Sequence, residues 1–307
     1  MAKASPIGSI DAVAGPSRGT IRPGGSLLSG GGESPDIAGA APWLAKRSSG
    51  PEEVDRMQTS STLPDPAPLA GGRALFLDLD GTLAPIAPRP QDVRLNDDQR
   101  DILRRLAARL GGRLAILSGR SISDVDRILG GAVIAVAGVH GLERRGADGR
   151  LTRAEPGAGL AAARSVLQAF VRDHPALLLE DKGLGLGLHF RAAPTLGAEA
   201  RRLAERLAQS HDLTLQPGDK VIELRTRGPN KGDALRAFMA EPPFAGAVPV
   251  FVGDDLTDED AFDAARRLRG AGVLVGLGRP TMADSRLADV KAVFTWIEAS
   301  MTGSVAA

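Results

Sequence analysis

The sequence contains no cysteine among its 307 residues, which excludes disulfide frameworks, thiolate metal sites and cysteine nucleophiles. It also lacks an excess of either charge, with 38 basic and 37 acidic residues, so no global field recruits nucleic acid or an anionic membrane. No apolar run approaches the roughly 18 to 20 residues of a membrane span, and the first residues lack the apolar core of a signal peptide. We therefore expect a cytoplasmic protein without nucleic-acid or membrane partners.

The composition that is present divides the chain into two unequal parts. Overall 43% of the residues are hydrophobic, enough for one large domain or two small ones. More than half of residues 1–70 are Gly, Ala, Pro or Ser, and such a segment buries too little to offset its ordering entropy. We predict a disordered arm over residues 1–70, and leave open whether it is a tail, a docking segment or a regulatory element.

Alternating apolar runs and helical patterns follow this arm. Short runs typical of buried strands occur at 73–77, 113–117, 133–137, 248–252 and 273–275, and the helical patterns between them favour a parallel sheet with helices on both faces. Residues 160–171 and 195–209 are instead helix-like stretches that separate two hairpin-like pairs, 177–180 with 186–191 and 213–216 with 221–225. The prediction is an α/β protein whose Rossmann-like core, residues 71–142 and 228–307, carries an inserted α+β domain, residues 143–227.

Acidic residues follow two of these predicted strands. Asp78 and Asp80 come directly after the first, and an acidic run that starts at Asp254 comes after 248–252. In such a sheet, ligands gather beyond the carboxyl ends of the strands. Two adjacent carboxylates repel each other unless a cation keeps both ionised, and oxygen ligands without His or Cys suit Mg²⁺. We expect Asp78, Asp80 and Asp254 around one Mg²⁺.

The same residue types suit phosphoryl transfer. An aspartate beside Mg²⁺ can attack phosphorus, and a second carboxylate can protonate the leaving alkoxide and later activate water; Asp78 and Asp80 fit these roles. Ser118 and Lys231 can supply donors to the phosphate oxygens. Each feature alone is also typical of a structural turn or a helix cap. Their common order along one sheet edge favours the catalytic interpretation.

Four motifs give these residues a family resemblance. Residues 76–83 (FLDLDGTL), 117–120 (LSGR), Lys231 and 253–255 (GDD) resemble the motifs of haloacid-dehalogenase-like (HAD) phosphohydrolases. The resemblance implies Asp78 as nucleophile, Asp80 as general acid and base, and Ser118 and Lys231 as phosphate-holding residues. It also implies Asp254 as a metal ligand, with Asp255 and Asp258 supporting the metal's water shell, and makes the insertion a mobile cap of the C2 type.

The insertion narrows the resemblance to one family. Residues 138–143 (GVHGLE), 180–183 (EDKG), 220–225 (KVIELR) and 253–262 (GDDLTDEDAF) look like those of trehalose-6-phosphate phosphatases, over about residues 72 to 300. This implies that sugar hydroxyls meet one set of residues on the cap and another on the core: Glu180, Lys182 and Glu223, and Gly119, Arg120, His140 and Gly141. Two departures are Phe190, where that family often has tyrosine, and the bare strand around Gly185 and Gly187.

The expected function is Mg²⁺-dependent hydrolysis of trehalose 6-phosphate to trehalose and phosphate, through an aspartyl-phosphate, in trehalose biosynthesis. We expect a monomer, and a trehalose-phosphate synthase is the macromolecular partner considered. One alternative is a phosphatase or phosphomutase for another sugar phosphate, because the cap alone chooses the substrate. A second alternative is a non-catalytic scaffold that recruits the synthase through the arm.

Overall fold

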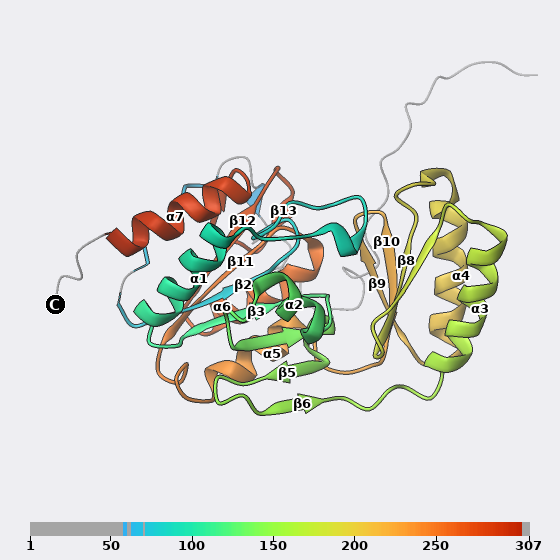
Figure 1. The fold of residues 1–307 in the computed structure, drawn as a ribbon, viewed down its shortest axis with the longest axis horizontal. Helices are drawn as coiled ribbons and strands as arrows, with labels where there is room; N and C mark the ends of the chain where they lie inside the picture. The colour runs from blue at the N-terminus through green and yellow to red at the C-terminus, as the bar shows by residue number, and fades with distance from the viewer. Residues whose placement is uncertain (1–57, 60–62, 70, 303–307) are drawn as a thin grey trace, which may run out of the picture. The chain divides into compact units, whose positions relative to one another are not determined.

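The computed structural model describes residues 58–59, 63–69 and 71–302 (Figure 1). The disordered arm expected for residues 1–70 therefore lies mostly outside the described residues. The described residues of this segment contact the core. Strand β1 (Gln58–Thr59) pairs with β13 (Pro280–Thr281), and the carbonyl oxygen of Ala67 accepts a hydrogen bond of 3.0 Å from the Trp296 indole. The chain is thus joined to the core before its first long strand begins.

An eight-stranded sheet forms the core, in the order β14-β12-β11-β2-β3-β4-β5-β6. Its pairs are parallel from β14 to β4 and antiparallel between β4, β5 and β6, which confirms the predicted α/β class. The strands of this sheet are β2 (Arg73–Leu77), β3 (Leu114–Leu117), β4 (Ala135–Gly138), β5 (Glu143–Arg145), β6 (Leu151–Arg153), β11 (Val248–Gly253), β12 (Ala271–Val275) and β14 (Ser285–Leu287).

Helices cover both faces of this sheet, because its central strands are apolar on both sides. Along β2, Leu75 and Leu77 join one buried cluster and Ala74 and Phe76 the other, as the alternation of side chains in a strand requires. The first cluster packs against α1 (Asp97–Arg109), α2 (Ile122–Leu129) and α7 (Val290–Thr302), and the second against α5 (Lys231–Met239) and α6 (Glu259–Arg267).

A separate four-stranded antiparallel sheet is inserted between β6 and α5 (Figure 1). It has the order β7-β8-β10-β9, and its apolar side chains pack with α3 (Leu160–Asp173) and α4 (Gly197–Ser210) into a third buried cluster. Its strands are β7 (Leu178–Asp181), β8 (Gly185–His189), β9 (Thr214–Gly218) and β10 (Val221–Arg225). Both predicted hairpin-like pairs are antiparallel neighbours, β7 with β8 and β9 with β10.

The expected insertion limits, 143 and 227, stay a prediction. Strands β5 and β6 lie within residues 143–153 but belong to the large sheet, so the inserted helices and strands begin only with α3. We call residues 160–225 the cap and the eight-stranded sheet with its helices the core.

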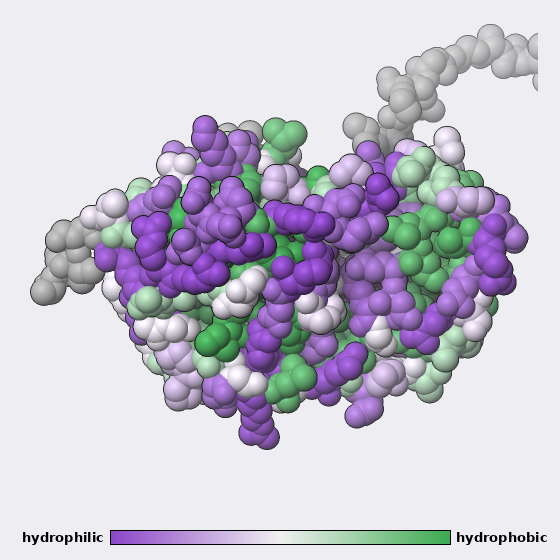
Figure 2. All heavy atoms as spheres, viewed as in Figure 1, coloured by the Kyte–Doolittle hydropathy of each residue, from purple (hydrophilic) through white to green (hydrophobic). Residues whose placement is uncertain are grey.

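The surface that Figure 2 shows is dominated by hydrophilic residues, with hydrophobic ones in smaller groups between them. Among the described residues, exposed large apolar side chains lie on separate elements, such as Ile134 before β4 and Val166 on α3. Single exposed apolar residues are ordinary on a folded domain. Within the described part of the chain, none of the helices combines the length and the apolar character that crossing a membrane requires.

Candidate active site

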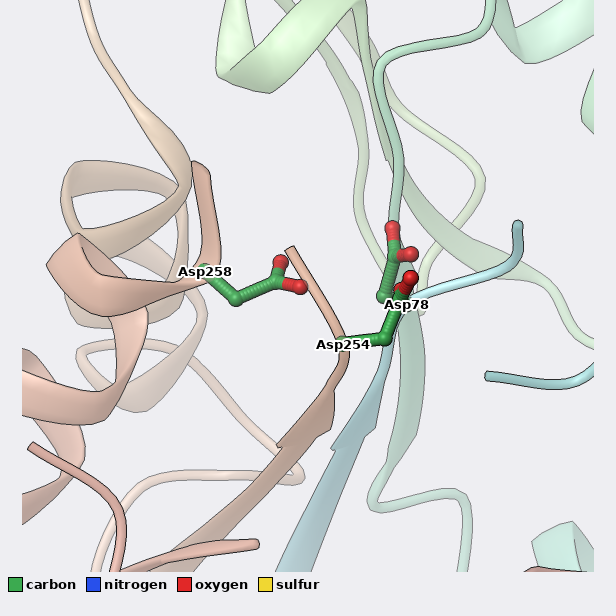
Figure 3. Close-up of side chains that lie close together, drawn as sticks. All are labelled: Asp78, Asp254 and Asp258. Carbon is green, nitrogen blue, oxygen red and sulfur yellow. The ribbon is translucent and has the colours of Figure 1, made fainter. Parts of the chain in front are cut away.

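Three aspartates converge at the carboxyl edge of the core sheet. Asp78 follows β2, Asp254 follows β11, and Asp258 ends the short 3-10 helix η7 (Leu256–Asp258). One carboxylate oxygen from each lies within 4.8 Å of the others, and Figure 3 shows their side chains directed toward one another. Because parallel strands β2 and β11 are neighbours, their carboxyl ends bring Asp78 and Asp254 together as the sequence predicted.

The ammonium group of Lys231 lies among these carboxylates. Its Nζ donates to Asp78 Oδ1 at 2.7 Å and to Asp258 Oδ1 at 2.6 Å, and all three side chains are buried. Burial by itself lowers the pKa of Lys231, but the Asp258 and Asp78 carboxylates outweigh burial and raise it. Asn230 is the N-cap residue of α5 and forms a capping box, which fixes the start of the helix at Lys231. This start of the helix directs Lys231 into the site.

The site disfavours the ionised form of two of the carboxylates. Burial is the main cause that raises the pKa of Asp78 to about 7, with Lys231 opposing and Asp258 adding to it. Burial, then repulsion by Asp78 and Asp258, raises the pKa of Asp254 to about 9. One lysine thus faces more acidic groups than it can neutralise. A divalent cation fits this donor set, because it binds oxygen ligands and stabilises their ionised form.

The carboxylate of Asp80, a residue expected to bind the metal, is paired with an arginine. Its Oδ2 accepts from Arg120 Nε at 2.6 Å and its Oδ1 from Arg120 Nη2 at 2.8 Å, so the carboxylate forms a bidentate pair with the guanidinium. The structure groups Asp258, not Asp80, with Asp78 and Asp254. Gly81, next along the chain, has φ +83°, and a Cβ there would lie 2.0 Å from Asp254 Oδ2. Only glycine fits this turn beside the carboxylate cluster.

A strained segment of the core faces the cap. Val139 and His140 have φ values of +46° and +56°, a region that is unusual for a β-branched residue. His140 Nε2 lies 2.9 Å from Glu223 Oε2 on β10 of the cap. Burial lowers the pKa of His140 more than Glu223 raises it, so the neutral ring donates from Nε2, and the buried Nδ1 has no hydrogen-bond partner among the described residues.

The three cap residues named from the sequence meet at this point. Lys182 is hydrogen-bonded to Glu223, and its ammonium lies 4.0 Å from Glu180. Burial would raise the pKa of Glu223, but Lys182 and His140 together hold it well below its usual range. In the same way, burial opposes and Glu223 favours the ammonium form of Lys182, whose pKa is raised. The result is a buried, charged network with donors and acceptors suited to sugar hydroxyls.

A cavity of about 180 Å³ joins the two groups of residues. Most of the residues singled out from the sequence line it: Asp78, Asp80, Gly119, Arg120, His140, Glu180, Lys182, Glu223, Lys231, Asp254 and Asp255. Ser118, Gly141 and Asp258 do not line the cavity. The Ser118 hydroxyl accepts from the Arg120 N–H at 3.2 Å, and a Cβ on Gly141 would lie 2.6 Å from the Asn230 carbonyl oxygen; both therefore stand behind the lining residues.

Several further residues line the same cavity without having been predicted from the sequence, among them His189, Arg191 and Asp219. His189 Nε2 lies 2.9 Å from Glu180 Oε2, and the two side chains meet diagonally across β7 and β8 over Gly187. A Cβ on Gly187 would lie 3.3 Å from His189 Nε2, so the bare strand leaves room for this contact. The available signal was the two-residue spacing of Gly187 and His189, which places both on one face of β8.

Aspartates and a buried lysine lie at the carboxyl edge of the parallel sheet, and an inserted cap lies over the same edge. This arrangement is that of a haloacid-dehalogenase-like protein. A haloacid dehalogenase-like hydrolase from Bacteroides thetaiotaomicron has the same fold, with a TM-score of 0.52 at 16% identity over 74% of this chain and 98% of that chain. Within that class, residues 76–291 match the sequence model of the trehalose-phosphatases. The chain belongs to this enzyme family.

Individual relatives agree with this assignment. The chain is 41% identical over 232 residues to a trehalose-6-phosphate phosphatase of Escherichia coli, covering 75% of this chain and 87% of that protein. It is 38% identical to a probable trehalose-phosphate phosphatase of Sinorhizobium fredii, covering 66% and 77%. The solved C-terminal domain of a Candida albicans trehalose-6-phosphate phosphatase shares the fold, with a TM-score of 0.68 at 22% identity over 75% of this chain and 92% of that chain.

Proposed function

We propose that the chain is a Mg²⁺-dependent phosphatase that hydrolyses trehalose 6-phosphate to trehalose and phosphate. The observation that carries this proposal is the single cavity lined both by the core residues Asp78, Lys231 and Asp254 and by the cap residues Lys182 and Glu223. The first group has the chemistry of phosphoryl transfer, and the second has the donors and acceptors that distinguish one sugar from another. The relatives named above act on the same substrate by their names.

Asp78, Asp254 and Asp258 are the residues whose oxygens would hold the metal, directly or through its water molecules. When bound, Mg²⁺ supplies charge that stabilises the carboxylates in their ionised form and neutralises the oxygens of a phosphate. Asp255 lies next to this group, and burial followed by repulsion from Asp258 raises its pKa. It adds negative charge that a divalent ion offsets.

The proposed reaction has two steps. In the first, a carboxylate oxygen of Asp78 attacks phosphorus, the bond to the sugar oxygen breaks, and Asp80 donates its proton to that oxygen. In the second, Asp80 takes a proton from water, whose oxygen attacks the aspartyl-phosphate and releases phosphate. Lys231 holds Asp78 in place and neutralises charge that develops on the phosphate oxygens. Because both oxygens of Asp80 are bound to Arg120, Asp80 must leave this pair to act.

The cap residues, with His140 of the core, select and enclose the sugar. Lys182 contacts both Glu180 and Glu223, and Glu223 also contacts His140; hydroxyl groups of a disaccharide can take over these contacts. The buried His140 Nδ1 offers an acceptor that is free of hydrogen bonds from the described residues. The cavity of about 180 Å³ is smaller than the roughly 300 Å³ at which sites for small molecules begin. Entry of the sugar phosphate therefore requires these bonds to open, and closure excludes water from the reaction.

The substrate and the reaction are tested together by measuring phosphate release. Trehalose 6-phosphate is compared with glucose 6-phosphate, sucrose 6-phosphate and mannose phosphates, each with Mg²⁺ and with chelator. Selective, chelator-sensitive release from trehalose 6-phosphate is the expected result. Turnover of a different sugar phosphate would retain the core chemistry and replace the substrate. If no phosphate is released from any compound, the proposed enzyme activity is contradicted and a non-catalytic scaffold is favoured. A scaffold would need none of Asp78, Asp80, Lys231 and Asp254, so their presence argues against it.

The cytoplasmic location, the monomeric state and a trehalose-phosphate synthase as partner remain predictions. So do the general acid and metal-binding roles of Asp80, the phosphate-holding role of Ser118 and the sugar contacts of Gly119, Arg120 and Gly141.

A further inference from the structure

The loop after β12 reaches back to the metal-binding edge through one arginine. Arg279 lies just beyond β12, after an exposed turn in which Leu277 is 88% exposed, and its own side chain is only 19% exposed. Its Nη2 donates to the carbonyl oxygen of Asp255 at 2.7 Å, and its Nε lies 3.4 Å from the carbonyl oxygen of Asp254. The guanidinium thus contacts the backbone of the loop that carries Asp254.

Arg279 is itself held by a buried carboxylate. Glu259, at the start of α6, is paired with Arg279 Nη1, accepts from the Thr281 hydroxyl at 2.9 Å, and accepts from the Met282 N–H at 2.7 Å. Glu259 therefore joins Arg279 and the residues that follow it to α6. A guanidinium anchored in this way has little freedom left to lose when it binds a carbonyl group.

The Asp254–Asp255 loop is held from two sides. It connects β11 to the short helix η7. On the inner side, the N–H of Asp255 is held by Asp258 Oδ2 at 2.9 Å. On the outer side, Arg279 holds the carbonyl of the same residue. The two contacts fix the peptide units on either side of Asp255.

We propose that Arg279 is a positioning residue for the metal site: it holds the Asp254–Asp255 loop from behind, so that Asp254 is directed at the ion. This inference rests on the proposed metal-dependent function. It predicts that loss of the guanidinium weakens metal binding while substrate recognition by the cap is retained. Removal of groups that orient metal ligands typically lowers metal affinity by about 10- to 100-fold.

Direct binding of Mn²⁺, followed by its electron paramagnetic resonance signal, tests the proposal without relying on activity. Arg279→Met keeps the aliphatic stem and removes the donors. We expect at least about a tenfold loss of Mn²⁺ affinity, partial recovery in Arg279→Lys, and a KM for trehalose 6-phosphate at saturating metal close to that of the unchanged protein. The matched control is Arg266→Met: Arg266 contacts the Met282 carbonyl and Asp284 nearby, and its loss should leave Mn²⁺ affinity unchanged.

Two results would overturn the proposal. Mn²⁺ affinity in Arg279→Met within about twofold of the unchanged protein would show that the loop holds its position without the guanidinium. An equal loss in Arg279→Met and Arg266→Met would reduce Arg279 to general support of this region. If the unchanged protein binds no Mn²⁺, the proposed metal-dependent function fails and the inference with it. If Arg279→Met does not fold, Arg279→Lys is the deciding variant. It keeps the positive charge but loses the planar guanidinium group, so a Mn²⁺ affinity equal to that of the unchanged protein would overturn the proposal.

Discussion

Asp78 combines two properties that compete with each other. Burial favours its neutral form and raises its pKa to about 7, whereas attack on phosphorus requires the carboxylate. Lys231, hydrogen-bonded to Asp78 at 2.7 Å, favours the anion, and a bound cation does so further. In the proposed mechanism, Asp78 can therefore act as the nucleophile only when both Lys231 and the cation stabilise its carboxylate.

Replacement of Asp78 by asparagine separates these properties. The amide side chain would keep the volume and resemble the neutral carboxyl group that burial already favours, so Asp78→Asn should fold with a thermal unfolding midpoint at or above that of the unchanged protein. Loss of the nucleophile should lower kcat by at least about a thousandfold. Phosphate release and thermal unfolding measure the two effects. Asp98→Asn, on the exposed first turn of α1, is the matched control, and activity above about 1% in Asp78→Asn would contradict the nucleophile assignment.

The positions of these residues were more predictable than their contacts. Strand ends and residue spacing placed Asp78 and Asp254 at one sheet edge, because parallel neighbours end together. The partner of Asp80 could not be predicted in the same way, since its orientation depends on Arg120, which the fold brings from the end of another strand. For the same reason no sequence pattern indicated that Arg279 contacts the Asp255 carbonyl.

The cap sheet presents its polar groups from adjacent strands. Glu180 on β7, His189 on β8 and Glu223 on β10 are brought together by the β7-β8-β10 order, while Lys182 follows β7 directly. Register keeps these side chains on one face, because a slip by one residue would turn them all away from the cavity. The proposed sugar recognition is thus a property of this sheet as a unit.

Lys182→Met tests the proposed role of the cap sheet in sugar recognition. The change removes the cation that holds Glu223 and Glu180, and loss of hydrogen bonds to charged groups costs about 1.5–3 kcal/mol. We expect KM for trehalose 6-phosphate to rise at least about tenfold, while hydrolysis of p-nitrophenyl phosphate, which has no sugar, stays within about threefold. Lys220→Met, exposed at the β9–β10 turn, is the control. Equal losses on both substrates would mean that Lys182 supports the core chemistry and not sugar recognition.

Regular elements with strong patterns were predicted well, and weak ones were not. The four cap strands were predicted from apolar runs joined by glycine-containing turns. Strands β5 and β6 have three residues each, and β6 is exposed throughout. Such short strands have no hydrophobic alternation to reveal them, because they are defined by pairing, β5 with β4 and β6 with β5, and not by side-chain burial. No pattern in residues 143–153 therefore assigned them to the core sheet.

The carboxylate cluster also makes the stability of the whole molecule depend on pH and metal. Folded-state pKa values of about 7 for Asp78 and about 9 for Asp254 lie above those of the unfolded chain. A raised pKa contributes stability at low pH that is lost as pH rises through the folded value. The metal-free protein should therefore lose stability as the pH rises from about 4, near the unfolded pKa values, to about 9. The loss is up to about 1.4 kcal/mol per pH unit for each group until its folded pKa is passed.

Mg²⁺ should reverse this trend. Because the metal binds the ionised carboxylates, protons compete with it, and stabilisation by the bound ion grows with its affinity. Thermal unfolding with chelator and with millimolar Mg²⁺ should show a larger Mg²⁺-dependent rise in midpoint at pH 8 than at pH 6. Asp254→Asn should flatten the pH dependence and reduce the rise. A rise that is equal at both pH values, or larger at pH 6, would contradict this assignment of the ligands.

The order of strands in the core sheet has a consequence for synthesis on the ribosome. Leu75 of β2 pairs with Val250 of β11, across more than half of the chain, whereas the cap is built from one continuous stretch. The cap can therefore fold while later residues are still being translated, but β2 keeps an apolar, unpaired edge until β11 emerges. Non-local pairing of this kind folds slowly and exposes strand edges to aggregation. Recombinant yield should therefore depend on translation rate and chaperone supply more strongly than the stability of the finished protein would suggest.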